Sequence, residues 1–262
     1  MKSKQLRRLV LDPVFRKEYL ELKRLRRLPR FTPGTTELSG SRVNFPDAKS
    51  FLFMYREIFE QQIYRFRAAA LEPVILDCGA NIGLSVLYFK KLFPGSRIVA
   101  FEPDPAVFSL LDGNVKAAGL NDVILKNQAV WSRTSELPFM ADGADGGRVV
   151  ATDPEKVRQT VPAVRLRDFL AEKVDFLKLD IEGAETEVLS DCADRLTNIS
   201  NLFVEYHSFA DRPQTLSAIV GLLSNAGYRL HVHPPVTSPQ PFYQREIHLG
   251  MDMQLNIFAF RA

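Results

Sequence analysis

The sequence predicts an α/β fold in which helices cover a doubly wound, mostly parallel sheet. Two observations predict it. From residue 74 onward, short apolar runs rich in β-branched residues alternate with helical segments. A glycine-containing turn between Gly79 and Gly83 joins the first run to a helix, and such a turn lets a backbone approach a ligand closely. At 262 residues and 46% apolar content, the chain can bury one large core with an appendage.

The appendage is basic. Residues 1–30 hold eleven Lys or Arg and only three acids, a net charge of +8, whereas the whole chain has +3. Leucines spaced among the basic residues of 15–28 predict an amphipathic helix with a basic face. This helix can pack on the domain, or residues 1–30 can bind an anionic membrane surface or an acidic partner. Nucleic acid is not the expected partner, because no known nucleic-acid-binding motif is present.

Proline, glycine, serine and threonine in residues 31–49 predict a linker, with a short strand at 41–45. The predicted division is therefore a basic helical arm and linker over 1–49 and a main domain over 50–262. Aromatic and aliphatic residues recur at helical spacing through 50–70 and predict a helix that caps the domain. Such aromatics usually belong to a core, but they could also line an acceptor pocket.

The first strand, at residues 74–76, ends in Asp77 and the glycine turn, and a helix over 84–93 follows. A dinucleotide fingerprint needs glycine at the first, third and sixth turn positions, which here hold Gly79, Asn81 and Leu84. Only the first matches. The turn therefore favours a nucleoside cofactor without a pyrophosphate, and S-adenosylmethionine is the obvious candidate. Asp77, Gly79, Asn81 and Gly83 form its predicted cofactor-binding loop.

A second strand at 97–101 ends in Glu102. A carboxylate at this place can accept hydrogen bonds from both hydroxyls of a ribose, and it would repel a 2′-phosphate. A helix over 105–118 and a third strand over 123–127 follow. Gln128 or the backbone near Ala129, at the end of that strand, could bind the adenine base.

Residues 132–160 contain three glycines and scattered polar residues, which predict a variable excursion with a hairpin of 137–140 and 148–151. A fourth buried strand at 174–179 leads into Asp180, Glu182 and Glu185. Open α/β sheets bind ligands outside the carboxyl ends of their strands, so Asp180 should face the crevice that the glycine turn lines. For Glu185, helix capping is the simpler interpretation.

The fifth predicted strand, 202–205, ends in Glu205, with His207 two residues further on. His207 should project into the same crevice as Asp180, either as a structural residue or as a catalytic or acceptor-binding one. A helix over 214–226, a strand over 228–233, a proline-rich turn and a final strand over 254–260 predict a closing antiparallel hairpin.

Together these residues resemble the FkbM-type S-adenosylmethionine-dependent methyltransferases. The resemblance spans residues 74–207, and its most diagnostic stretch is Lys178 to Glu185. It implies a Rossmann-like sheet of seven strands with one reversed strand, and methylation of a hydroxyl of a sugar, glycan or natural product. It also adds Ala80 and Pro103, within the shared motifs, to the cofactor-binding residues, beside Asp180. The matching motifs are Leu76 to Gly83, Phe101 to Pro103, Val174 to Glu185 and Val204 to His207.

A hydroxyl is a poor nucleophile at neutral pH, so methyl transfer needs a base. Asp180, His207 and Glu182 are the predicted catalytic residues. Alternatively, Asp180, Glu182 and Glu205 could supply oxygen ligands to Mg²⁺, although no ligand spacing in the sequence defines a metal site. Two other classes stay open: a nicotinamide-dependent oxidoreductase, and a non-catalytic protein of the same fold that binds an anionic surface through its arm.

The two cysteines, Cys78 and Cys192, suggest neither a disulfide framework nor a metal site. No stretch reaches the ~20 apolar residues of a membrane span. The sequence therefore predicts a cytoplasmic protein that its arm could hold at a membrane surface.

Overall fold

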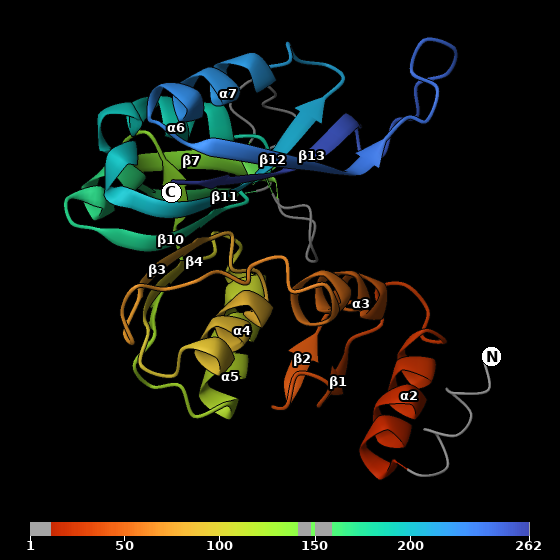
Figure 1. Cartoon of the computed structure of the whole chain (residues 1–262). Coiled ribbons are helices and arrows are strands. Elements are labelled where there is room, and N and C mark those ends of the chain that lie inside the picture. The colour runs from red at the N-terminus through yellow and green to blue at the C-terminus, as the bar shows by residue number, and fades with distance from the viewer. Residues whose placement is uncertain (1–11, 141–147, 150–158, 262) are drawn as a thin grey trace.

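A seven-stranded sheet forms the centre of the molecule (Figure 1). The computed structural model describes residues 12–140, 148–149 and 159–261. The strands of the sheet are β3 (Val74–Cys78), β4 (Arg97–Phe101), β5 (Ile124–Lys126), β10 (Val174–Leu179), β11 (Ile199–Phe209), β12 (Arg229–Thr237) and β13 (Met251–Phe260). Their order is β12-β13-β11-β10-β3-β4-β5, and β13 is the one strand that runs antiparallel to its neighbours. The predicted Rossmann-like sheet with one reversed strand and a closing hairpin is confirmed.

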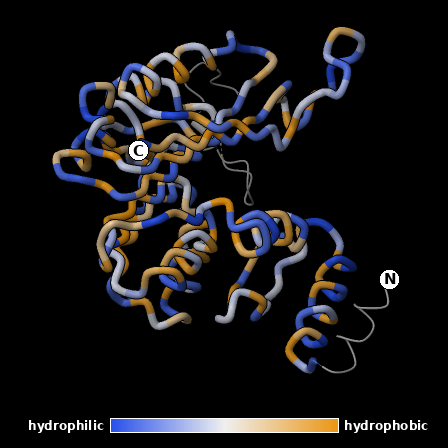
Figure 2. The backbone as a smooth tube through the Cα atoms, in the orientation of Figure 1, coloured by the Kyte–Doolittle hydropathy of each residue, from blue (hydrophilic) through white to orange (hydrophobic). Residues whose placement is uncertain are grey.

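Helices cover both faces of this sheet. In Figure 1, α4 (Leu84–Leu92) and α5 (Pro105–Ala117) lie on one side of it, and α6 (Glu185–Asp191) and α7 (Leu216–Asn225) lie on the other. Neighbouring residues of β3 divide between the two layers, since Ile75 packs in the core under α4 and α5 and Leu76 in the core under α6 and α7. Apolar residues accordingly run along the central strands in Figure 2. The sheet is therefore buried on both sides, and ligands can reach it only at its edges.

The N-terminal elements share a core with the main domain. They are α2 (Pro13–Leu25), β1 (Gly34–Thr36), β2 (Val43–Phe45) and α3 (Ala48–Tyr55). Asp12 caps α2, accepting a hydrogen bond from the backbone N–H of Phe15. Leu25, Val43 and Phe45 are fully buried in the same cluster as the residues of α4. The N-terminal elements therefore pack on the main domain, and the boundary at residue 49 stays a prediction.

The helix predicted over 50–70 is wrong in its second half. It begins at Ala48, where Asp47 accepts a hydrogen bond from the N–H of Ser50, and continues as a π-helix, η1 (Arg56–Glu60). Gln62 then takes a φ of 56°, which ends any helix. The turn carries Tyr64 and Phe66 into an aromatic cluster with Phe176 under the sheet. Core packing thus overrides the helical spacing.

The segment predicted as an excursion contributes to a second sheet of order β6-β9-β7-β8, which begins before residue 132 and ends after residue 160. Its strands are β6 (Ala129–Trp131), β7 (Ser135–Met140), β8 (Arg148–Val149) and β9 (Gln159–Arg165). The predicted hairpin is present where β7 pairs with β8, while residues 150–151 lie outside the described residues. The sequence analysis missed β9, in which Pro162 is exposed between the buried Val161 and Ala163. Residues 159–261 also contain the short 3₁₀ helices η3 (Leu166–Leu170) and η4 (Ala193–Asn198).

The strand predicted at 202–205 is longer, because β11 pairs along its length with β13. It runs past the end of β10 to Phe209, so His207 lies within the strand, opposite Gln254. The hairpin strands β12 and β13 likewise extend beyond the predicted ranges. No helix among residues 12–140 and 159–261 is long and apolar enough to cross a bilayer.

Candidate functional site

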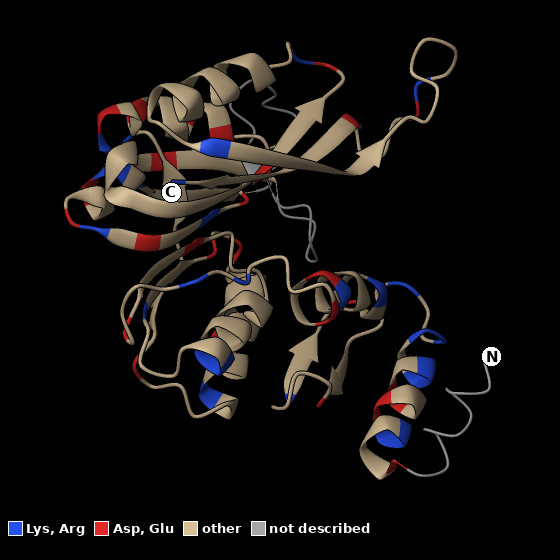
Figure 3. Cartoon of the chain, in the orientation of Figure 1, with Lys and Arg blue, Asp and Glu red and all other residues tan. Residues whose placement is uncertain are grey.

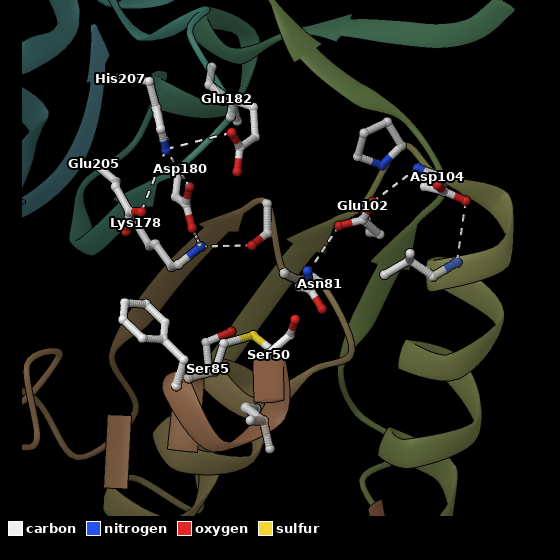
Figure 4. Close-up of a pocket in the computed structure, with 18 of the residues that line it drawn as sticks. Ser50, Asn81, Ser85, Glu102, Asp104, Lys178, Asp180, Glu182, Glu205 and His207 are labelled. Atoms are coloured by element: carbon white, nitrogen blue, oxygen red, sulfur yellow. Dashed lines mark hydrogen bonds and ion pairs between the residues drawn. The ribbon is translucent and has the colours of Figure 1, made fainter. Parts of the chain in front are cut away.

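A cavity of about 600 Å³ opens at the carboxyl ends of β3, β4, β10 and β11. This is the edge where the strand order reverses between β3 and β10, and where α/β sheets bind their ligands. Ten of the predicted site residues line the cavity: Gly79, Ala80, Asn81, Glu102, Pro103, Gln128, Ala129, Asp180, Glu182 and His207. Asp77 and Gly83 do not. Figure 4 shows the lining residues in two groups, one around Glu102 and the other around Asp180.

The glycine loop is pressed against the end of β10. Gly79 has a φ of 84°, and a Cβ on it would lie 1.8 Å from the backbone oxygen of Asp180. The N–H groups of Gly79 and Ala80 both donate to the carbonyl oxygen of Phe101, at 3.0 and 2.9 Å. Asn81 has a φ of 48°, which asparagine tolerates better than most residues. The loop therefore joins three strand ends, and only glycine fits at its first position.

Glu102 is aimed by two backbone groups. Its Oε2 accepts a hydrogen bond from the N–H of Asn81 at 3.0 Å, and its Oε1 accepts one from the N–H of Asp104 at 2.9 Å. Each oxygen keeps a further lone pair for a ligand. Burial raises the pKa of Glu102 to about 7, although the two N–H groups oppose the shift. This geometry is suited to a pair of ribose hydroxyls.

Asp77 and Gly83 support the loop from below. The Asp77 carboxylate is fully buried and accepts a hydrogen bond from the Ser85 hydroxyl. Burial raises the pKa of Asp77, while Lys178, whose Nζ is 3.8 Å away, opposes the shift. Gly83 begins α4 with a φ of 92°. Both residues, predicted to bind the cofactor, therefore hold the loop in place without lining the cavity.

Gln128 and Ala129 lie where an adenine-binding group was expected, at the end of β5. The preceding residue, Asn127, explains their position. Its side-chain amide donates to the carbonyl oxygens of Glu102 and Pro103, at 2.8 and 3.1 Å. These bonds tie the segment after β5 to the segment after β4, so that both border one cavity.

Lys178 connects the two sides of the cavity, and the sequence analysis gave it no role in the site. Its Nζ donates to the carbonyl oxygen of Gly79 at 2.7 Å and to Asp180 Oδ2 at 2.9 Å. Burial disfavours the ammonium charge, but Asp180 and Asp77 outweigh it and raise the pKa of Lys178. The sequence could have indicated a role for Lys178. Residues two apart in a strand share a face, and Asp180 follows Lys178 by two residues.

His207 lies among carboxylates at the other end of the cavity. Its Nδ1 is 3.0 Å from Glu185 Oε1, and its Nε2 is 3.5 Å from Glu205 Oε1, 3.7 Å from Glu182 Oε2 and 4.0 Å from Asp180 Oδ1. Burial opposes a charge on the imidazole, but Glu182 and Glu185 outweigh it and raise the pKa of His207 well above its usual value. The surrounding acids therefore favour the protonated imidazole as long as no other cation lies among them.

Two further acids belong to the site. Glu185, expected to cap its helix, accepts hydrogen bonds from the N–H groups of Gly183 and Ile181 and also orients His207. Glu57 comes from the π-helix and lines the cavity. Burial, together with the charges of Glu205 and Asp180, raises the pKa of Glu57 to about 7. No local motif marks Glu57, because only the packing of η1 on the cavity brings it there.

The predicted Mg²⁺ ligands were Asp180, Glu182 and Glu205. Among the described residues, the side chains whose donor atoms lie within 4.8 Å of one another are Asp180, Glu205 and His207. Burial raises the pKa of Glu182 to about 8, while His207 opposes the shift. A nitrogen donor thus enters the set in place of one oxygen.

The aromatic segment was expected to belong to the core and could also line an acceptor pocket. Phe51 is fully buried in the core, whereas Phe53, Met54 and Ile58 line the cavity. Arg30 and Phe31, from the predicted linker, border it as well. The N-terminal region therefore supplies part of the wall where an acceptor would lie.

The fold and this cavity define a Rossmann-like protein with a carboxylate held by backbone N–H groups on one side of the cavity and an acid-rich cluster on the other. Comparison with known proteins names the class. Residues 77–230 match the model of the methyltransferase FkbM domain. The chain belongs to the FkbM methyltransferase family, and it is an S-adenosylmethionine-dependent methyltransferase. This assignment decides against the nicotinamide-dependent oxidoreductase and the non-catalytic protein.

Relatives from several organisms support the assignment. Methyltransferase 1 of Beauveria bassiana (strain ARSEF 2860) is 28% identical over 213 residues, covering 71% of this chain and 84% of that protein. The 31-O-demethyl-FK506 methyltransferase FkbM of Streptomyces tacrolimicus is 29% identical over 227 residues, covering 72% and 86%. The crystal structure of methyltransferase FkbM from Methylobacillus flagellatus KT is similar in fold, with a TM-score of 0.51 and 15% identity, over 93% of this chain and 59% of that longer one.

Proposed function

We propose that this methyltransferase transfers the methyl group of S-adenosylmethionine to a hydroxyl oxygen of a sugar, glycan or natural-product acceptor. One observation carries the proposal: a carboxylate aimed for a ribose and a cluster of acids with a histidine face the same cavity from opposite sides. The relative from Streptomyces tacrolimicus, whose name specifies an oxygen, supports an oxygen acceptor. The cavity volume of about 600 Å³ has room for a nucleoside beside a small acceptor group.

The cofactor side of the cavity would bind S-adenosylmethionine through the close fit of the glycine loop and through hydrogen bonds to Glu102. S-adenosylmethionine, when bound, supplies an electrophilic methyl group, so the protein chiefly has to align the acceptor oxygen with it. Glu102 would accept hydrogen bonds from the ribose hydroxyls while the N–H groups of Asn81 and Asp104 hold it. Gln128 and the backbone at Ala129 would border the base. The Gly79 loop would sit against the cofactor, because no side chain intervenes there.

On the acceptor side of the cavity, a carboxylate would remove the proton of the acceptor hydroxyl. Asp180 and Glu182 present carboxylate oxygens to the cavity, and either can accept a hydrogen bond, and then the proton, from an acceptor hydroxyl. Lys178 holds Asp180 on one side, and His207, itself held by Glu185, lies behind both acids. His207 therefore acts as a positioning and charge-balancing group in this proposal, and a carboxylate takes the role of base.

An acceptor screen tests the proposal. The purified chain is incubated with S-adenosylmethionine carrying a labelled methyl group and with panels of sugars, glycans and hydroxylated natural products. The expected result is label in an ether linkage on at least one acceptor, together with S-adenosylhomocysteine. Transfer to nitrogen or carbon acceptors alone would overturn the assignment of a hydroxyl.

The predicted cytoplasmic location is supported by two buried free cysteines, Cys78 and Cys192.

A further inference from the structure

The histidine at the acid cluster is held as a metal ligand would be. Glu185 Oε1 lies 3.0 Å from Nδ1, and Glu185 is itself fixed by the N–H of Gly183 at 2.9 Å. Nε2 therefore faces Asp180 and Glu205. The side chain of His207 is only 2% exposed, and its Nε2 lies 3.5 Å from Glu205 Oε1 and 4.0 Å from Asp180 Oδ1. A carboxylate that fixes one imidazole nitrogen and frees the other is the usual second shell of a metal-bound histidine.

The donor atoms are close enough to share one ion. Nε2 of His207 is 3.5 Å from Glu205 Oε1 and 4.0 Å from Asp180 Oδ1, and all three donors lie within 4.8 Å of one another. Donors bonded at about 2.1 Å to one zinc-sized ion lie roughly 3 to 4 Å apart. Small side-chain shifts would thus complete the contacts. Glu182 Oε2, 3.7 Å from Nε2, can supply a fourth donor.

The cluster also carries more negative than positive charge. Asp180, Glu182, Glu185 and Glu205 each place an oxygen within 4.0 Å of the His207 ring nitrogens, so four acids face the imidazole and Lys178, which contacts Asp180. Like charges crowded together at low exposure repel strongly. A divalent cation that took the place of the Nε2 proton would offset this repulsion and attract the carboxylates.

We propose that Asp180, Glu205 and His207 bind a divalent transition-metal ion. An imidazole nitrogen in the ligand set favours Zn²⁺, Co²⁺ or a similar ion over Mg²⁺, which prefers oxygen. The purpose of the ion rests on the proposed function: an acceptor hydroxyl that reached it would lose its proton more easily. Its binding does not rest on that function, because the ligand set is complete without an acceptor.

Co²⁺ is the probe for this site. Chelator-treated full-length protein is titrated with CoCl₂ while visible absorption is recorded, and with Zn²⁺ and Mg²⁺ by calorimetry. The expected result is one Co²⁺ or Zn²⁺ per chain, with Mg²⁺ binding at least roughly 100-fold more weakly. His207→Asn keeps a donor toward Glu185 but removes Nε2, and should weaken Co²⁺ binding by about 100-fold or more. His248→Asn, which changes another histidine at the cavity, should leave it unchanged.

Glu185→Gln provides a second variant, with an expected 10- to 100-fold weakening through the second shell. The proposal is overturned if wild-type protein binds no Co²⁺, or if His207→Asn and Glu185→Gln both bind it as wild type does. Binding of S-adenosylmethionine is measured on the same samples. Cofactor binding without metal binding contradicts the metal site alone, and metal binding without cofactor binding contradicts the proposed function alone.

Discussion

The cofactor half and the acceptor half of the cavity are held together by different forces. Around Glu102, backbone N–H groups do the positioning, and neighbouring charges play a small part. Around Asp180, side chains from β10, β11 and the following loop face one another at 3.5 to 4.0 Å with opposite and like charges. The first half should tolerate changes of charge nearby, whereas the second depends on a balance that one substitution can disturb. Substitutions can therefore separate binding from chemistry.

The largest effect is expected on the rate, in the acceptor half. Glu182→Gln removes one carboxylate that can accept the hydroxyl proton, so kcat should fall by roughly 10²- to 10⁴-fold. Affinity for S-adenosylmethionine should change less than about threefold, because Glu182 lies outside the cofactor loop. Stability should not fall, since one of several crowded acids is neutralised. Steady-state kinetics, calorimetry and thermal unfolding measure the three. The control is Glu187→Gln, an exposed residue of the helix α6 that follows Glu182, and equal kcat values for the two variants would refute the role of Glu182.

The next largest effect is expected on stability, at the contact between Gly79 and the backbone of Asp180, where the two halves of the cavity meet. Gly79→Ala places a Cβ 1.8 Å from the backbone oxygen of Asp180, and β3 and β10 would have to separate. We expect a loss of about 3 kcal/mol or more in the free energy of unfolding. Gly119→Ala is the matched control: its φ of 73° is also left-handed, but nothing lies within 4 Å of the added atom. It should cost only about 1 kcal/mol. If urea unfolding gave similar losses of stability for Gly79→Ala and Gly119→Ala, the close approach of Gly79 to Asp180 would not contribute to stability.

In the cofactor half, Glu102→Gln should weaken binding of S-adenosylmethionine by about 10- to 100-fold, equivalent to ~1 to 3 kcal/mol. The amide must turn its NH₂ group toward one of the two backbone N–H donors, so one bond is lost and a ribose hydroxyl loses an acceptor. Calorimetry measures this, with Glu136→Gln at an exposed position of β7 as control. Unchanged affinity in Glu102→Gln would mean that the ribose lies elsewhere.

The pH dependence of cofactor affinity should be a smaller effect, and it should come from Glu102. With a pKa of about 7, Glu102 is partly protonated in the free protein at neutral pH. Ribose hydroxyls stabilise the ionised form, so cofactor affinity should rise by up to about 10-fold between roughly pH 6 and pH 8. The raised pKa also means that the folded state holds this proton more tightly than the unfolded state. Its contribution to stability is therefore lost as the pH rises from about 4.5 toward 7. Glu102→Gln should flatten both profiles, and a slope that persists in this variant must come from other groups.

Substitutions in the basic arm are expected to have the smallest effect on binding of S-adenosylmethionine in the cavity. Lys and Arg cover much of α2, which lies apart from the sheet in Figure 3. Arg16→Glu with Lys23→Glu, both exposed, should leave affinity for S-adenosylmethionine within about twofold, since distant surface charges are screened. The same pair should weaken binding to anionic vesicles, by about 1 kcal/mol for each basic residue lost, if the arm docks on a membrane. Vesicle sedimentation at low and high salt measures this, and an unchanged curve would leave the arm as packing alone.

Several features followed from local sequence. The apolar run before Asp77, the glycines at 79 and 83, and the acid at Glu102 predicted a cofactor site at successive strand ends, because each signal is contiguous and depends on backbone geometry. The strands and their helices were found in the same way. The helix over 50–70 failed, because the aromatic residues at its end pack against a distant strand. The sequence analysis also missed β9, which pairs with β6 and β7 across intervening chain.

The sequence by itself determined which carboxylates, glycines and histidine would lie at the edge of the sheet, since strand ends and turn residues are encoded over a few positions. Only the tertiary structure decided how those groups meet. It placed Lys178 between Gly79 and Asp180, turned Glu185 from a helix cap into a partner of His207, and brought Glu57 and Phe53 to the wall of the cavity. Distances of 3 to 4 Å between residues tens of positions apart depend on the packing of helices and strands, which no local pattern specifies.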